Sequence, residues 1–332
     1  MRIVPLPIAI AVLAIASAQG QMPPASILEI QVENAVRYQE DISDLSRFAT
    51  NPDVTTAIPP KNFFFRVNIG DIVAVNGQPA KGTMTRDNRT VDLSPTPNPG
   101  QAIADTVRNS VIADTFEILN LDGIPIGTIV SYGLAAGSPA PGAPLSITQG
   151  NFAIVGGTGA FLGARGQWGN AVSAQTITER LASVTEDPAN RRRNGGGRLK
   201  FVLQVVPMFV PQVAMTATGP AVFHSDFSLV TPAKPAKAGE VLIARTTGLG
   251  PTRPGVNPGQ PFPTDSLQEV NSPVAVTVNG QSADVINKLG WPGLVDAYRV
   301  DFRVAEGTTA GMAAIQLTAA WIAGSTVSIP IQ

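Results

Sequence analysis

Hydrophobic and β-branched residues recur along the chain in short runs separated by turn-forming residues. Pairs of these runs flank three dipeptides that are typical of β-hairpin turns: Asn76-Gly77, Asp122-Gly123 and Asn279-Gly280. Asn, Asp and Gly tolerate the positive φ angles of a type I′ turn, so the flanking runs are expected to pair across each dipeptide. The pattern therefore predicts an all-β protein.

Further runs have the composition of strands. They are 27–32, 63–69, 82–85, 152–155, 199–206 and 221–229, followed by 241–246, 298–304, 313–318 and 325–331. Segment 101–113 is the main exception, because Ile103, Val107 and Val111 recur at helical spacing. A strand preceded by a loop fits this segment equally well.

Proline-rich stretches at 94–100 and 138–144 predict loops, because each proline lacks a backbone donor and restricts the residue before it. A similar stretch, 231–239, separates two series of strands. We interpret it as a linker between two domains, which the length of the chain also favours.

The first residues have the features of a secretory signal peptide. Arg2 precedes an apolar run over 3–15, and Ala16-Ser17-Ala18 forms a small-residue cleavage site. We therefore predict a signal peptide over 1–18 and a secreted mature protein, extracellular or periplasmic. The run is too short to span a bilayer, and no later stretch is long and apolar enough, so we do not expect an integral membrane protein.

Composition excludes several kinds of chemistry. The net charge is −1, which does not favour nucleic-acid binding. The chain has no cysteine, which removes disulfides, thiolate nucleophiles and cysteine-ligated metals. A single histidine makes an imidazole metal site unfavourable, and we expect no metal and no cofactor.

The glycine-rich segment 151–167 first suggests a nucleotide-binding loop. Leu162 occupies the position of the third glycine of the dinucleotide fingerprint, and further glycines follow where a helix would begin. The segment therefore predicts a structural turn between two strands, formed by Gly156, Gly157, Thr158 and Gly159.

The same segment resembles the signature of the dirigent and allene oxide cyclase barrel superfamily, in which a strand ending in a G-G-[ST]-G turn leads to an aromatic residue and then A-R-G. Weaker matches precede it in order at 63–71, Gly82 and 116–127. The resemblance implies an eight-stranded antiparallel β-barrel over 27–230, a homotrimer and a small apolar or phenolic ligand inside the barrel. The family's Tyr-x-His-Asp context is absent from 27–34, so no catalytic residue is assigned.

The last part of the chain is similar to an immunoglobulin-like C-terminal domain of secreted acidobacterial proteins. The resemblance rests on 235–240, 247–252, 276–283 and 298–304. It implies a β-sandwich over 240–332 that acts as an accessory or adhesion-like module in contact with the cell envelope. Short strands with frequent turn signals agree with this interpretation.

Three charged residues lie in or beside apolar runs of the predicted barrel: Arg66, Glu117 and Arg165. If they face the interior, they can bind a ligand or act as acid and base, and otherwise they are surface groups. His224 has Ser225 and Asp226 beside it, but consecutive strand residues face opposite sides, which favours a surface or half-buried histidine over a triad. The basic segment 191–198 is interpreted as a solvated loop, with an anion or polysaccharide contact as the alternative.

Three functions emerge as hypotheses. The first is a non-catalytic exported protein that binds a small apolar or phenolic molecule in the barrel. The second is an isomerase or cyclase of the allene oxide cyclase or dirigent type. The third is a structural or adhesive cell-envelope protein with a filled barrel. We favour the first.

Overall fold

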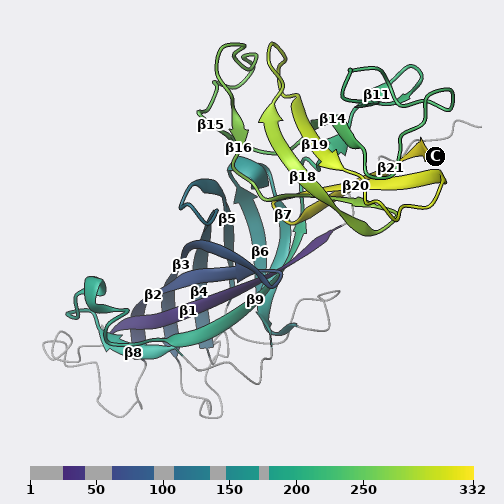
Figure 1. Cartoon of the computed structure of the whole chain (residues 1–332). Coiled ribbons are helices and arrows are strands. Elements are labelled where there is room, and N and C mark those ends of the chain that lie inside the picture. The colour runs from purple at the N-terminus through teal and green to yellow at the C-terminus, as the bar shows by residue number, and fades with distance from the viewer. Residues whose placement is uncertain (1–24, 42–61, 93–107, 135–146, 172–178) are drawn as a thin grey trace, which may run out of the picture.

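Among the residues that the structure describes, the regular secondary structure is almost entirely β-strand (Figure 1). The computed structural model describes residues 25–41, 62–92, 108–134, 147–171 and 179–332. The predicted signal peptide, both proline-rich loops and residues 101–107 lie outside the described residues. The prediction of an all-β protein is confirmed, and segment 108–113 belongs to a strand.

The first sheet closes into an eight-stranded antiparallel barrel, as predicted. Pairing runs in the order β2-β3-β4-β5-β6-β7-β9-β1, and β1 pairs with β2 again. The strands are β1 (Ser26–Asp41), β2 (Asn62–Val75), β3 (Gln78–Asp92), β4 (Arg108–Leu119), β5 (Pro125–Leu134), β6 (Ile147–Gly157), β7 (Arg165–Ala171) and β9 (Gly197–Val206). A short strand, β8 (Arg180–Ser183), lies parallel to the last part of β1, beyond the point where β9 pairs with it.

All three predicted hairpins are present. Asn76-Gly77 joins β2 to β3. Asn279-Gly280 joins β17 (Val274–Val278) to β18 (Gln281–Gly290) in the second sheet, and both asparagines have a φ of 50°. Asp122-Gly123 lies in the slightly longer connection between β4 and β5. Turn chemistry thus determined these connections.

The second sheet has ten strands and is nearly closed around a core of its own. Its main path runs β10-β14-β19-β18-β17-β20-β21, and the ends of the path, β10 and β21, contact each other. The strands of this path are β10 (Gln212–Val213), β14 (Val241–Thr247), β17 (Val274–Val278), β18 (Gln281–Gly290), β19 (Tyr298–Arg303), β20 (Gly311–Ala319) and β21 (Ile322–Ile331). Three short strands lie off it: β13 (Val222–Phe223), β15 (Thr252–Arg253) and β16 (Glu269–Val270).

The division between the two domains differs from the predicted one. Strands β10 and β13 pair with β14 of the second sheet, and the last barrel strand, β9, ends at Val206. Residues 212–230, which the sequence assigned to the barrel, therefore belong with the second domain. The proline-rich stretch 231–239 is a connection inside that domain, where Ala236 bridges to Ile331.

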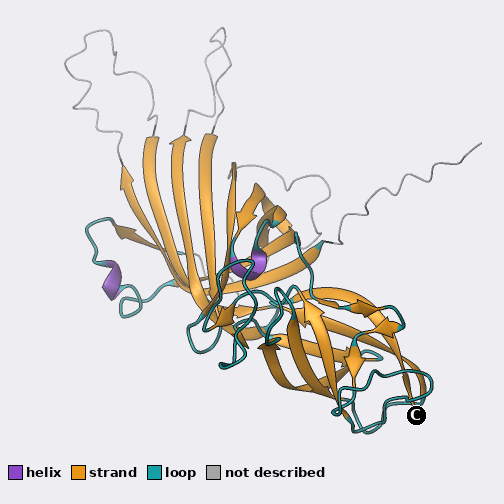
Figure 2. Cartoon of the chain, turned by 90° about the horizontal axis from the view of Figure 1, so that it is seen from above, coloured by secondary structure: helices purple, strands orange, loops and turns teal. Residues whose placement is uncertain are grey.

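The second domain closes one end of the barrel, which we call the near end, and we call the opposite end the far end (Figure 2). The turn between β20 and β21 has Ala320 and Trp321 at φ angles of 47° and 62°. Ala320 and Ile322 belong to the barrel core, and Trp321 donates from Nε1 to Oε1 of Gln78 at 3.1 Å. Since left-handed backbone is unfavourable for such residues, the packing of the hairpin against the barrel must hold this turn.

Candidate ligand site in the barrel

The near half of the barrel interior is filled by apolar side chains. Every second residue of a barrel strand faces inward, and the inward residues here are almost fully buried: Leu28, Ile30, Ile72, Met84, Ile118, Ile129, Leu203 and Val205. Phe161, on the short 3-10 helix η2 (Gly159–Phe161), joins them near the second domain. This half therefore acts as a hydrophobic core.

A layer of aromatic rings lies next along the barrel axis. Phe152 stacks on Trp168 with ring centroids 4.2 Å apart, while Phe116 and Phe201 meet each other and Trp168 edge to face. The guanidinium group of Arg86 lies over three of these rings, 5.3 to 5.9 Å from their centroids. Such cation–π contacts stabilise a cation that has left water. Arg86 thus marks the boundary between the filled near half and the far half of the interior.

Five polar side chains form one level around the far half of the interior, which we call the polar level: Arg37, Asn68, Arg86, Asp114 and Ser131. Each is the register partner of the next across strands β1 to β5. Partners on neighbouring antiparallel strands share a face of the sheet with Cβ atoms about 5 Å apart. The polar level is therefore a continuous row, although its members come from distant parts of the sequence.

Arg86 and Asp114 form a buried ion pair within this row. Arg86 Nε donates to Asp114 Oδ1 at 2.7 Å, and Ser131 Oγ donates to Asp114 Oδ2 at 3.2 Å. Burial raises the pKa of Asp114, against the opposing effects of Arg86 and Ser131. Burial alone would lower the pKa of Arg86, but the charge and hydrogen bond of Asp114 outweigh it and raise that pKa.

Glu179 joins the other end of the row. Its carboxylate accepts from Asn68 Nδ2 and from Arg37 Nη2, each at 2.5 Å, and the residue is buried. Three buried polar atoms of the row nevertheless have no hydrogen-bond partner among the residues that the structure describes: Arg37 Nε, Asn68 Oδ1 and Arg86 Nη2. Most buried polar groups in proteins are paired, so this group of atoms requires an explanation.

Farther along the barrel, a second polar row contains Gln39, Arg66 and Asn88, which are again register partners. Arg66 Nε donates to Gln39 Oε1 at 2.9 Å. A shallow depression that is open to solvent lies beside this row, lined by Gln39, Leu181, Ala182 and Ser183. The far half of the interior thus has polar walls among the described residues.

The three residues that the sequence suggested for ligand binding, Arg66, Glu117 and Arg165, do not all face the barrel interior. Arg66 faces the interior and is buried. Glu117 pairs with Thr83 at positions that face outward, and its side chain is exposed. Arg165 is also exposed and donates to the carbonyl of Val155 at 2.6 Å. Glu117 and Arg165 are therefore surface groups, whereas Arg66 belongs to the interior.

Sequence reasoning missed the charged residues that do meet inside the barrel. Arg86 follows directly on the predicted strand 82–85, and Asp114 follows segment 101–113, which fits a helix and a strand equally well by its sequence. The alternation of Met84 and Arg86, and of Ile112 and Asp114, would have placed each charge on a buried face. Their pairing depends on the register between strands, which no local pattern contains.

The glycine-rich segment connects β6 to β7, which pair in antiparallel fashion. Thr158 anchors the turn to β5, with its backbone N donating to the Thr128 carbonyl at 2.9 Å. Gly159 has a φ of 60°, and a Cβ there would come 2.3 Å from the carbonyl oxygen of Ile126. The segment therefore serves the packing of the near end, and no helix comes after it to bind a phosphate.

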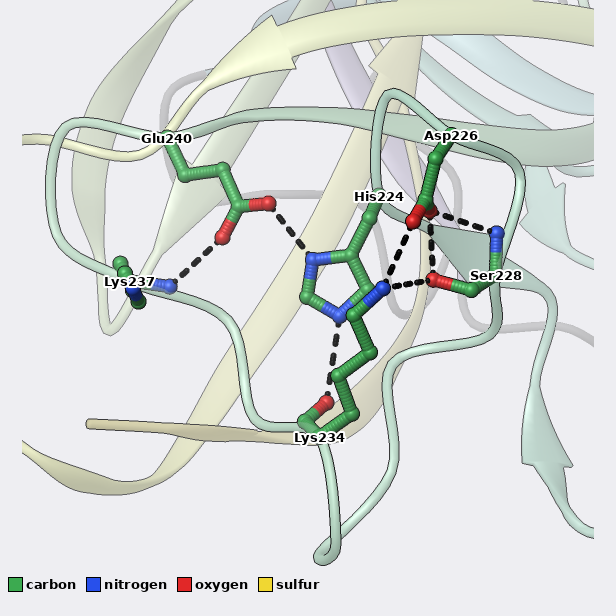
Figure 3. A network of polar contacts seen from close by, with 6 residues as sticks. All are labelled: His224, Asp226, Ser228, Lys234, Lys237 and Glu240. Atoms are coloured by element: carbon green, nitrogen blue, oxygen red, sulfur yellow. Dashed lines mark hydrogen bonds and ion pairs between the residues drawn. The ribbon is translucent and has the colours of Figure 1, made fainter.

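His224 lies in a polar network of the second domain (Figure 3). It is buried just after β13, with Nδ1 2.6 Å from Glu240 Oε1 and Nε2 3.2 Å from the carbonyl oxygen of Lys234. Asp226 contacts Ser228 and Lys234 instead of the imidazole. The histidine is thus more buried than predicted, and it links two loops without forming a triad with Ser225 and Asp226.

The basic segment is only partly solvated. Arg192 is exposed, but Arg191 is buried and donates from Nη2 to Asp71 Oδ1 at 2.5 Å and from Nη1 to the Asn34 carbonyl at 2.7 Å. Burial acts to raise the pKa of Asp71, but hydrogen bonds from Arg192, Arg191 and Asn34 outweigh it and bring the pKa to about 2. This cluster holds the loop between β8 and β9 against the outside of the barrel.

Comparison with known proteins finds no match among family models, curated proteins or solved structures. Within the described part of the chain, no helix combines the length and apolar character that crossing a membrane requires. In the same residues, no group of three or more histidine, aspartate or glutamate side chains is placed to hold a metal ion.

Proposed function

We propose that this is an exported binding protein that holds a small molecule in the far half of its barrel. The observation that carries the proposal is the group of unpartnered buried atoms on Arg37, Asn68 and Arg86, which lie side by side in the polar level. A stable interior with three adjacent unsatisfied groups favours a missing partner.

The side chains that line the barrel interior decide between the apolar and the phenolic ligands that the resemblance implies. The aromatic layer and the near half are already filled by side chains, so they leave little reason to expect a long apolar ligand. The far half has charged and amide groups from two polar rows. Of the apolar and phenolic ligands that the family resemblance implies, a phenolic molecule with polar substituents fits these walls better.

The buried acid–base pair does not favour an isomerase or cyclase. Both oxygens of Asp114 are engaged, by Arg86 and Ser131, and the residue is 0% exposed. A general acid or base must reach the proton that it transfers. Asp114 is better suited to hold Arg86 in place than to move protons on a ligand.

We further propose that the barrel is dirigent-like and that the second domain is an immunoglobulin-like accessory module that contacts the cell envelope. The closed eight-stranded barrel and the antiparallel second sheet support these assignments at the level of architecture. Architecture alone does not define activity, so the proposal for the barrel rests on its polar level.

Native mass spectrometry of the mature protein, purified from its own host, tests the proposed function. We expect a small molecule to be released from the barrel on denaturation, and a mass for the intact assembly that corresponds to a trimer. Arg37→Met, which removes one of the unpartnered donors, should lower the amount of bound molecule. A protein that never retains or binds a small molecule would contradict the proposal.

A further inference from the structure

We infer that His224 is a pH-dependent latch of the second domain. With a proton on each ring nitrogen, it donates to both Glu240 and the backbone carbonyl of Lys234. With only one proton on the ring, it can donate to only one of them. The inference is independent of the proposed ligand in the barrel, and it begins from the two oxygens that face the ring (Figure 3).

Both oxygens that the ring nitrogens approach are hydrogen-bond acceptors. Glu240 Oε1 lies 2.6 Å from Nδ1, and Oε2 of the same carboxylate accepts from the backbone N of Lys237 at 2.8 Å. The carbonyl oxygen of Lys234, 3.2 Å from Nε2, also accepts from the backbone N of Thr231. A neutral imidazole has one donor and one acceptor nitrogen, whereas an imidazolium has two donors. The imidazolium is therefore the form that complements both contacts.

The ring is buried beside the carboxylate that compensates its charge. The side chain of His224 is 7% exposed, so water has little access to either nitrogen. A buried charge is tolerated when it is paired and hydrogen-bonded. The ammonium group of Lys234 is bonded to Asp226 Oδ2 at 2.7 Å, so these two charges compensate each other beside the ring. The remaining charged groups around the segment of Glu240 are Lys237, Arg303 and Glu306.

The latch connects the turn 224–228 to the stretch 231–240. The turn is closed by hydrogen bonds from Phe227 N to the His224 carbonyl and from His224 N to the Ser228 carbonyl. Phe227 has a φ of 60°, which is unfavourable for a bulky side chain. The ion pair between Asp226 and Lys234 spans the same two segments, but both side chains are more than half exposed, so it should contribute little. The strained turn therefore depends on the buried histidine.

The stability of the second domain should fall as the pH rises. The folded network favours the ring with two protons, whereas the unfolded chain exposes the ring to water. The contribution of the latch is then fully present below the ordinary titration range of histidine, which is centred near about pH 6.5, and is lost as the pH rises above that range.

Nitrogen-15 NMR of the mature protein, labelled at histidine and purified without a histidine tag, tests the inference. His224 is the only histidine in the chain, so the ring signals need no assignment. We expect the folded protein to bind the second ring proton several-fold more tightly than the same protein unfolded in urea. In the folded protein both nitrogens should then have imidazolium chemical shifts at pH 6.

Glu240→Gln separates the latch from a simple loss of contact. The glutamine amide can donate from Nε2 to Nδ1 of His224 and still accept from Lys237 N through Oε1, so a neutral ring with its proton on Nε2 keeps all three contacts. In calorimetry, raising the pH from 5.5 to 8 should lower the wild-type unfolding temperature of the second domain by about 3 °C or more. The variant should show little change. Glu306→Gln, at an exposed carboxylate, is the matched control and should behave like the wild type.

Two results would overturn the inference. One is a folded protein whose ring binds its second proton no more tightly than the unfolded chain does. The other is a Glu240→Gln variant with the same pH dependence as the Glu306→Gln control. If Glu240→Gln does not fold, the comparison of folded and unfolded wild-type protein by NMR decides alone.

Discussion

Replacing Asp71 with asparagine removes the charge that holds the loop between β8 and β9 to the barrel. Asp71 lies on the outer face of β2 and accepts from Arg191, Arg192 and Asn34 at 2.5 to 3.1 Å. Its side chain is 12% exposed, so water screens these contacts only partly. The substitution keeps the shape of the side chain but loses its ion pairs.

The magnitude follows from the pKa of Asp71, which is about 2 in the folded protein against an ordinary value of 3.8. One pKa unit corresponds to about 1.4 kcal/mol, so the carboxylate contributes about 2 kcal/mol to the free energy of unfolding. A folded-state pKa below the unfolded one means that this stability is fully present above about pH 4. It is lost as the pH falls from about 4 to 2.

Urea denaturation followed by tryptophan emission, at pH 6 and at pH 2, measures this contribution. Trp168 lies inside the barrel, and comparison with Trp168→Phe identifies the barrel transition. We expect Asp71→Asn to lower the free energy of unfolding by about 2 kcal/mol at pH 6 and by much less at pH 2, where the wild-type carboxyl is about half protonated in the folded protein and almost fully protonated in the unfolded one.

Glu33→Gln is the matched control. Glu33 pairs with Arg198 at 3.5 Å, and both side chains are about half exposed, so this pair should contribute less than about 1 kcal/mol. The reasoning would be refuted if Asp71→Asn destabilised the protein equally at both pH values, or no more than Glu33→Gln does at pH 6.

Further substitutions test the other structural assignments. Asp114→Ala leaves Arg86 buried without its carboxylate and should cost about 3–5 kcal/mol in urea denaturation, whereas Arg86→Met with Asp114→Leu should recover most of that loss. Ile322→Ala opens a cavity where the second domain meets the barrel and should cost about 2–5 kcal/mol, with reduced hydrogen-exchange protection in barrel peptides; unchanged protection there would contradict the closed near end. His224→Ala should cost about 1–3 kcal/mol in calorimetry of the second domain, while Ser225→Ala, at an exposed residue, should have no effect.

The fold was predictable from the sequence where the signals are local. Asn76-Gly77 and Asn279-Gly280 fixed their hairpins because positive φ angles are a property of those residues. The domain boundary was not predictable in the same way. Proline-rich residues 231–239 look like a linker, but strands β10 and β13 before them pair with β14 after them. Long-range pairing therefore decided the boundary.

The ligand site was less predictable because it depends on a β-bulge in β1. Between Glu33 and Val36 this strand has one residue more than its partner β2, and Asn34 adopts a φ of 50°. Before the bulge, Leu28, Ile30 and Val32 face the interior. Continued alternation would have turned Val36 and Tyr38 inward, but the extra residue turns Arg37 and Gln39 inward instead.

The bulge connects the Asp71 cluster to the polar level. Asp71 accepts from the side chain of Asn34, and Arg191 donates to the Asn34 carbonyl, so both hold the bulged residue from outside the barrel. The same bulge brings Arg37 beside Asn68 on the inside. If the bulge depends on this outer cluster, Asp71→Asn should reduce the amount of small molecule that co-purifies with the barrel, even though Asp71 faces outward. Unchanged binding in this variant would mean that the bulge keeps its geometry without the outer cluster.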